Sequence, residues 1–150
     1  MFRRALPDGA SRRSLDRLSN RLTKIIGHRS VSFGYNDAMW AKYGAIISKQ
    51  LNLSDPATKE PPKTNIYNYG QEGSPRGTWE TMAKAGVQVA VCSSATLSTA
   101  TSLARATSQD VEAVVKELRS NLVKNGRMVP AGITTVAHAI ERGYASVAAA

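Results

Sequence analysis

Hydrophobic side chains recur every three or four residues in several stretches of the 150-residue chain, and this spacing predicts amphipathic helices. The clearest helix covers residues 37–51, where Asn36 is a suitable N-cap and Asp37 lies in the first turn. Its apolar face would consist of Met39, Trp40, Tyr43, Ile46, Ile47 and Leu51. A face this apolar has to be covered, either by the core or by another subunit.

Three further helices follow from the same spacing. One is expected over residues 78–85 and ends before Gly86, a residue that suits the position after a helix C-terminus. Another begins after Ser108, which we interpret as its N-cap, and the last covers about residues 131–143. Residues 93–106 are small and rich in hydroxyl groups, so we expect only a short helix or helical turns there.

Short apolar runs between these helices predict strands at about residues 23–27, 86–92, 127–130 and 144–147. Strands that alternate with helices are typical of βαβ units. We therefore expect a three-layer α/β/α domain with a mainly parallel four- or five-stranded sheet and helices on both of its faces. Residues 52–77 contain four prolines and three glycines, which predict a long irregular loop with an extended contact at residues 66–69.

The formal net charge of +9 is concentrated near the N-terminus, because residues 1–30 hold eight of the 20 lysines and arginines. We divide the chain into a basic N-terminal arm, residues 1–21, with one short helix at about residues 11–22, and an α/β domain, residues 22–150. Arginines without interleaved aromatic residues are weak evidence for nucleic-acid binding. No run approaches the ~18 apolar residues of a membrane helix, so we expect no membrane span.

Cys92 is the sole cysteine, and it ends the apolar run at residues 86–92. In an open α/β sheet, ligands bind in the crevice outside the carboxyl ends of the strands, and a helix N-terminus after Cys92 would favour a thiolate. Cys92 is therefore a candidate catalytic nucleophile. A lone cysteine at a strand end is usually an inert small hydrophobe, and the sequence leaves both interpretations open.

Three residues are candidates for binding beside Cys92. Ser93 and Ser94 offer hydroxyl and amide donors to an anionic sulfur. His28 follows the first strand and would lie on the same sheet edge, where it could stabilise a thiolate; the alternative is a surface histidine. The two histidines of the chain have no partners at the spacing of metal ligands, so no metal site is expected.

Several segments together resemble the DsrE/DsrF-like family over about residues 22–148. In chain order they are residues 36–43, 55–58, 85–92, 129–133 and 139–144. The first two are similar to a branch whose members often carry twin-arginine signals, and the third resembles the stretch around the family's sulfur-carrying cysteine. The match places that cysteine at Cys92.

What the resemblance implies is a small α/β protein that forms a homo-oligomer and relays sulfane sulfur as a persulfide on Cys92. Its partners would be sulfur donor and acceptor proteins, and no cofactor is expected. In enzymatic terms the chain is a candidate sulfurtransferase or sulfur carrier, with rates set by the thiolate fraction and access. The alternative is a non-catalytic oligomeric binding protein on the same fold with an inert cysteine.

Two features depart from the family. The strand–helix unit that normally precedes the segment matching residues 23–28 is missing, and residues 93–102 lack the glycine and basic residues found there in relay members. Without that unit, one sheet edge and the helix face bearing Trp40, Tyr43 and Ile47 lack cover. We expect a symmetric contact between subunits that is made partly by this helix or by the uncovered edge.

The expected location is cytoplasmic. Residues 11–15 look like the start of a twin-arginine export signal, but the residues that follow are polar instead of apolar. If the native gene product carries an export signal missing here, the location is periplasmic.

Overall fold

The computed structural model describes residues 2–4, 23–68, 78–141 and 144–146. The helix expected at about residues 11–22 lies outside the described residues, as does most of the basic arm.

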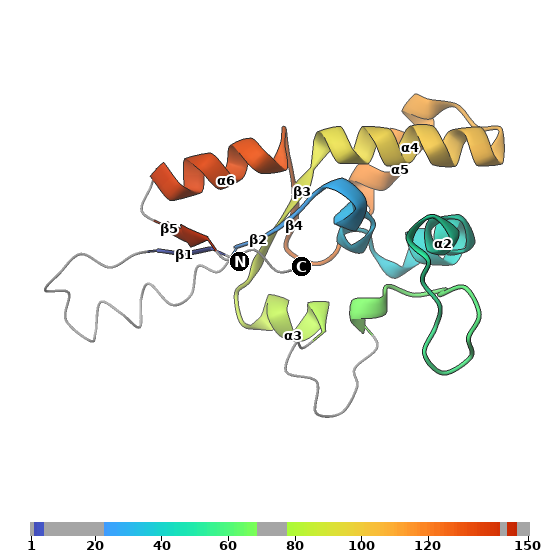
Figure 1. Cartoon of the computed structure of the whole chain (residues 1–150), viewed down its shortest axis with the longest axis horizontal. Helices are drawn as coiled ribbons and strands as arrows, with labels where there is room; N and C mark the ends of the chain where they lie inside the picture. Colours follow the sequence, from blue (N-terminus) through green and yellow to red (C-terminus); the bar gives the residue numbers. More distant parts are fainter. Residues whose placement is uncertain (1, 5–22, 69–77, 142–143, 147–150) are drawn as a thin grey trace, which may run out of the picture.

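Within the described residues, five short strands form one sheet in the order β4-β3-β2-β1-β5 (Figure 1). The strands are β1 Phe2–Arg4, β2 Thr23–Ile26, β3 Gln88–Cys92, β4 Gly126–Val129 and β5 Tyr144–Ser146. β2, β3 and β4 run parallel, whereas β1 runs antiparallel to both of its neighbours, β2 and β5. The sheet is therefore mixed, and its antiparallel part includes a strand from the segment that we expected to be an arm.

Helices account for most of the other described residues. They are the 3₁₀ helices η1 His28–Gly34 and η2 Ile66–Asn68, and the α-helices α2 Asp37–Leu51, α3 Trp79–Lys84, α4 Ser93–Thr107, α5 Val111–Ser120 and α6 Gly132–Glu141. α4 packs against α5 and η1, and α6 packs against β2, β3 and β5. η2 replaces the extended contact expected at residues 66–69, which is wrong for residues 66–68.

The expected three-layer α/β/α domain with a mainly parallel four- or five-stranded sheet is wrong. The described part of the chain is mostly helical, and only two of the four strand pairings in its sheet are parallel. In a doubly wound sheet, the helix that follows a strand packs back onto the sheet. Here α2 makes its main contact with α4 and lies to the right of the strands in Figure 1.

Polar contacts hold α2 against α5. The Tyr43 hydroxyl donates a hydrogen bond to a carboxylate oxygen of Glu117 at 2.6 Å, and Lys42 Nζ lies 2.7 Å from the other oxygen. Hydrogen bonds to a charged group are stronger than neutral ones. These contacts join side chains more than 70 residues apart, so the periodicity that defines α2 does not predict them. For the same reason the periodicity does not indicate that α2 packs away from the sheet.

The predicted boundaries of α2 are confirmed at both ends, residues 37 and 51. The side chain of Asn36 accepts a hydrogen bond from the backbone N–H of Met39 at 3.3 Å, as expected of an N-cap. The N-cap predicted for α5 is wrong. Asp110 caps this helix by accepting from the backbone N–H of Ala113 at 2.8 Å, while Ser108 ends α4 in the left-handed conformation.

α4 is a full helix of 15 residues where a short helix or helical turns were expected. Its hydroxyl groups bond back to the carbonyl four residues earlier, so they do not compete with the helical backbone. These bonds are donated by Thr96, Ser98, Thr101, Ser102 and Thr107. Its small residues also let α5 approach closely, with Ala100 and Leu103 fully buried.

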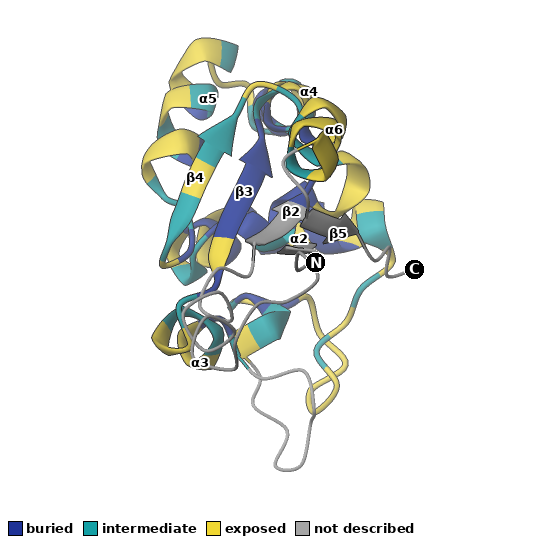
Figure 2. Ribbon diagram, turned by 90° about the vertical axis from the view of Figure 1, so that its left-hand side faces the viewer, coloured by how far each residue is buried: buried dark blue, intermediate teal, exposed yellow. Residues whose placement is uncertain are grey.

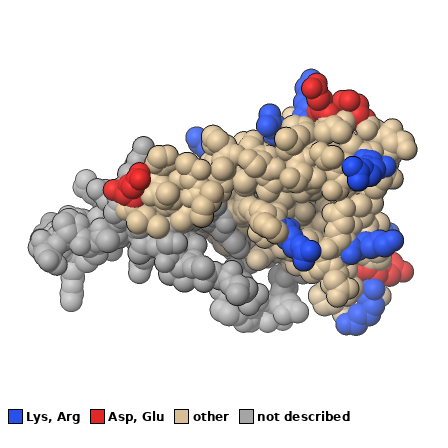
Figure 3. All heavy atoms as spheres, turned by 45° about the horizontal axis from the view of Figure 1, so that its top comes forward, with Lys and Arg blue, Asp and Glu red and all other residues tan. Residues whose placement is uncertain are grey.

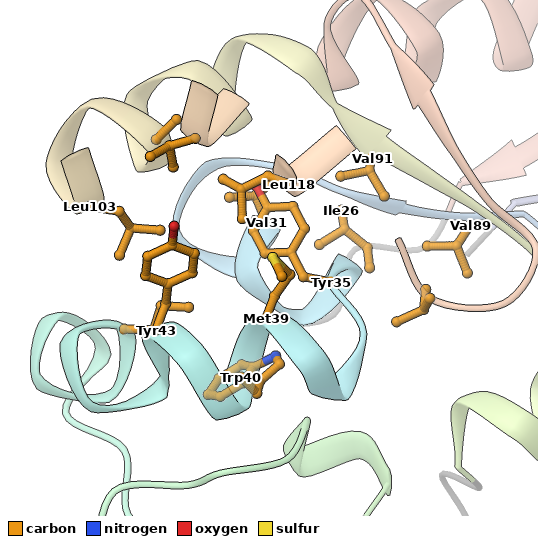
Figure 4. Close-up of a cluster of buried hydrophobic side chains, with 14 of the residues drawn as sticks. Ile26, Val31, Tyr35, Met39, Trp40, Tyr43, Val89, Val91, Leu103 and Leu118 are labelled. Carbon is orange, nitrogen blue, oxygen red and sulfur yellow. The ribbon is translucent and has the colours of Figure 1, made fainter. Parts of the chain in front are cut away.

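The core lies where η1, α2, α4 and α5 meet β3, and Tyr35 stands in its middle (Figure 4). β3 is buried along nearly its whole length, whereas β4 is more exposed (Figure 2). Trp40, Tyr43 and Ile47 are also fully buried within the single chain. The expectation that this face lacks cover is therefore wrong, and β2 is not an edge strand because β1 pairs with it.

The homo-oligomer stays a prediction, but its expected contact surface changes. Among the described residues, the exposed large hydrophobic side chains are Leu97 on α4 and Ile133 and Ile140 on α6. Ile133 is 79 % exposed, so the apolar face of α6, not that of α2, is the one left open to solvent.

The loop after α2 is fixed by close backbone packing. Asn65 is fully buried, and its side-chain amide donates to the carbonyl oxygens of Phe33 at 2.9 Å and Tyr35 at 2.8 Å. Pro62 is also buried, and its carbonyl rests on the helix at Gly44, where a β-carbon would overlap the carbonyl oxygen. The loop is thus anchored to the core through Pro62 and Asn65, whereas residues 56–61 are exposed.

Substitution Gly44→Ala should destabilise the protein although alanine is the better helix former by about 1 kcal/mol. The new methyl group would push against the Pro62 backbone, and overpacking of this kind costs about 2 kcal/mol. Urea unfolding measures the change. Ala45→Gly, at an exposed position of the same helix, is the control and should lose only the propensity term of about 1 kcal/mol. A rise in stability for Gly44→Ala would show that the loop does not rest on α2.

Candidate functional site

The carboxyl ends of the three parallel strands meet at one edge of the sheet, and a helix begins directly after each of them. η1 begins two residues after β2, α4 follows β3 without a gap, and α6 begins three residues after β4. A cavity of about 950 Å³ opens at this edge, between the beginnings of η1 and α6, the first three turns of α4 and the last residues of α2. Ligand sites in open sheets containing parallel strands commonly form at this edge.

Cys92 lies in the wall of this cavity. It is the last residue of β3, which runs between β2 and β4, and it is also the residue that precedes the first turn of α4. The predicted position at the end of an interior strand is therefore confirmed. The side chain is 7 % exposed, so the cavity is its route to solvent and to reactants.

Gly27 leaves the space beside the thiol open. An ideal β-carbon at Gly27 would lie 3.3 Å from Cys92 Cβ and 3.9 Å from Cys92 Sγ. The first distance is tighter than nearly all natural contacts of a β-carbon, so a side chain here would press on the cysteine. The end of β2 therefore approaches Cys92 as closely as it does because residue 27 has no side chain.

Two of the three predicted binding residues, His28 and Ser94, line the cavity together with Cys92. Ser94 Oγ donates to the carbonyl of Pro130 at 3.2 Å, which links α4 to the segment that leads into α6. Ser93 does not line the cavity, and its hydroxyl oxygen accepts a hydrogen bond from Arg119 at 3.1 Å. The structure thus separates the two serines.

His28 is exposed and adopts a left-handed backbone conformation, with φ of 51°. This conformation is uncommon outside glycine, although histidine and asparagine adopt it more readily than most residues. The backbone N–H of Arg29 lies 2.8 Å from Nδ1 of His28 and donates to it, so the neutral ring carries its proton on Nε2. His28 therefore lines the cavity with its Nδ1 already accepting a hydrogen bond from the backbone.

Sequence reasoning missed Arg29, Ser32 and Gln50, which also line the cavity. Arg29 could have been found, because it follows the same strand end as His28. Ser32 is buried at 4 % exposure in η1, a segment that the sequence presents only as a turn. Gln50 comes from the end of α2, and its position depends on the packing of α2 against α4, which no local pattern reveals.

A buried chain of hydrogen bonds lies behind Cys92. The Tyr35 hydroxyl donates to Thr96 Oγ1 at 3.0 Å, and Thr96 Oγ1 donates to the backbone carbonyl of Cys92 at 2.9 Å. Burial raises the pKa of Tyr35 from 10.0 to about 12; the hydrogen bond with Thr96 works against this rise, and a negative charge at Cys92 would add to it. The tyrosine therefore stays protonated and fixes the junction between β3 and α4.

Among the described residues, the lining of the cavity contains a positively charged side chain but no negatively charged one. Arg29 is the only lysine or arginine among the described residues that line it, and no aspartate or glutamate lines it. Nor does α4, η1 or α6 carry an acidic residue in its first turn. Figure 3 shows that the middle of this side of the molecule is largely uncharged, with most charged side chains toward its edges.

None of the helices among the described residues is long and apolar enough to cross a membrane. The described residues also contain no group of three or more His, Cys, Asp or Glu side chains that could hold a metal ion.

Comparison of the chain with protein-family models, with curated proteins and with solved structures finds no match. The resemblance to the DsrE/DsrF-like family therefore rests on the sequence segments alone.

Substitution Tyr35→Phe tests the hydrogen-bond chain behind Cys92. At neutral pH the variant should lose about 1 kcal/mol of unfolding free energy, the net value of one hydrogen bond. The raised pKa gives the sign of the pH dependence: the hydroxyl contributes fully below pH 10 and its contribution is lost as the pH rises toward about 12. Urea unfolding of both proteins across this range should show their difference shrinking. A constant difference would show that the hydroxyl is not buried as described.

Substitution Gly27→Ala should slow the alkylation of Cys92 by narrowing the space beside the sulfur. We expect a fall of about tenfold in the iodoacetamide rate, corresponding to a barrier rise of about 1.4 kcal/mol, with a larger fall for a bulky maleimide. Ser93→Ala is the matched control, because Ser93 adjoins Cys92 in the chain but contacts Arg119 instead of lining the cavity. Equal rates in Gly27→Ala and the unchanged protein would place the access route elsewhere.

Proposed function

We propose that the chain is a cysteine-based sulfur carrier in which Cys92 takes up and releases sulfane sulfur. The observation that carries this proposal is the position of the sole cysteine, in the wall of a cavity of about 950 Å³ at the carboxyl ends of three parallel strands. The sequence segments that resemble the DsrE/DsrF-like family support the same chemistry, and membership of that family is part of the proposal.

Cys92 would act as the nucleophile. Its thiolate attacks the outer sulfur of a donor persulfide, the bond between the two donor sulfurs breaks, and the donor leaves as a thiolate. Cys92 then carries the outer sulfur as a persulfide. In the second half of the cycle an acceptor thiolate attacks this outer sulfur, and Cys92 is released as a thiolate. The two steps balance without an oxidant or a cofactor.

The residues around Cys92 suit an anionic sulfur. The first N–H groups of α4 lack a side-chain cap, and helix N-termini favour negative charge. The Ser94 hydroxyl already donates to Pro130, so Ser94 contributes its backbone N–H in this proposal. The neutral His28 ring, whose Nδ1 accepts from Arg29, contributes its Nε2–H as a hydrogen-bond donor. Ser93 has no part in it, because it does not line the cavity.

The alternative is a binding protein with an inert cysteine. Its support is the low exposure of Cys92, 7 %, which is typical of a small buried hydrophobe. The two proposals differ in whether sulfur becomes attached to Cys92.

Mass spectrometry after incubation with inorganic polysulfide distinguishes them. We expect a gain of one sulfur atom on the intact chain, absent in Cys92→Ser and reversed by cyanide, which removes sulfane sulfur as thiocyanate. Iodoacetamide-treated protein is the second control, because its thiol is blocked without any substitution. A folded chain whose thiol alkylates but never gains sulfur would leave the binding protein as the better proposal.

A further inference from the structure

The low exposure of Cys92 limits what can reach it. A cysteine on a partner protein would have to bring its sulfur past the rim of the cavity to a side chain that is 7 % exposed. A small molecule meets no such obstacle, and a volume of about 950 Å³ falls in the range of pockets that hold small organic ligands.

Arg29 gives the cavity a preference for negative charge. It is exposed, and it forms no ion pair with any described residue. With no described carboxylate in the lining, nothing in the cavity neutralises it. A guanidinium group in this position is suited to a ligand carboxylate, which it can hold through two parallel hydrogen bonds.

Ser32 adds an independent sign of a ligand. The residue is 4 % exposed and lines the cavity, yet its hydroxyl forms no hydrogen bond with any described residue. Since the hydroxyl oxygen is not itself fully enclosed, it is open to the cavity, where it can donate a hydrogen bond to a polar ligand.

Part of the wall is apolar. Leu51, Ile133 and Val136 line it, from the end of α2 and the first turns of α6. The cavity thus combines a thiol, a cationic group, a free hydroxyl and an apolar wall. These features match a molecule with a sulfur atom, a carboxylate and a short organic skeleton.

We infer that Cys92 exchanges sulfur with a low-molecular-weight carboxylate-bearing thiol and its persulfide, not with a protein thiol. The inference rests on the proposed function and replaces protein donors by a small molecule. In the uptake step, the Cys92 thiolate bonds to the outer sulfur of the persulfide R–S–SH and the bond between its two sulfurs breaks. R–S⁻ leaves with the electron pair and takes a proton from water, and the outer sulfur keeps its own proton on Cys92.

Binding is tested separately from chemistry in the full chain carrying Cys92→Ser, with reduced glutathione as the probe. Calorimetry should detect binding, and adding Arg29→Gln should weaken it by about tenfold, equivalent to about 1.4 kcal/mol. Ser32→Ala should weaken it as well. Arg105→Gln is the matched control, because Arg105 is exposed on α4 but does not line the cavity. Glutathione diethyl ester, whose carboxylates are masked, should bind as weakly to the Cys92→Ser protein as glutathione does to the Arg29→Gln variant.

The outcomes separate this inference from the proposed function. If polysulfide loads Cys92 but glutathione does not bind, or binds equally with and without Arg29, the sulfur carrier stands and the small-molecule partner is wrong. If glutathione binds through Arg29 but Cys92 never gains sulfur, the site for an anionic thiol stands and the relay is wrong. Circular dichroism of each variant confirms that the compared proteins are folded.

Discussion

The close contact between Gly34 and Val91 is the constraint on which the rest of the structure depends. A β-carbon at Gly34 would lie 2.8 Å from a methyl group of Val91, so η1 can rest on β3 only because residue 34 is glycine. From this contact the chain continues into the core with Tyr35 and then caps α2 with Asn36. The backbone of this segment also pairs with the segment between α5 and β4, since Val123 N–H donates to the Gly34 carbonyl at 2.9 Å.

The same contact determines the shape of the candidate site. Because η1 packs against β3, its first residues lie beside the end of that strand. The space between η1, α4 and α6 forms the cavity. The hydrogen-bond chain of Tyr35 and Thr96 fixes the backbone carbonyl of Cys92, so the part of the cavity wall that Cys92 forms is held in place. A site whose nucleophile is positioned by buried hydrogen bonds needs little rearrangement when a ligand binds.

Local sequence patterns predicted the parts of the structure that depend on local interactions. The helix at residues 37–51, its cap at Asn36 and the strand that ends at Cys92 were all recognisable from spacing and residue type. Non-local interactions determine the parts that were missed. β1 lies far from β2 in the chain and pairs with it antiparallel, and no periodicity signals such a pairing. The orientation of α2, which brings Gln50 to the cavity, depends on its contacts with α4 and α5.

Apolar periodicity also says nothing about what covers a helix face. The face of α2 that carries Trp40 and Tyr43 is fully buried in its own chain, whereas Ile133 on α6 is 79 % exposed. From the sequence alone, the apolar faces of α2 and α6 both require a covering element. They differ in exposure because η1 and the loop at Pro62 pack over α2.

The partial burial of Cys92 fits a carrier better than it fits a surface nucleophile. The outer sulfur of a persulfide is electrophilic and is lost to any thiolate that reaches it, so a carrier benefits from limiting access to it. In the proposed carrier the cavity would impose this limit through its size, and Arg29 would favour anionic thiols. Gly27, which has no side chain to fill the space beside the sulfur, belongs to the same geometry.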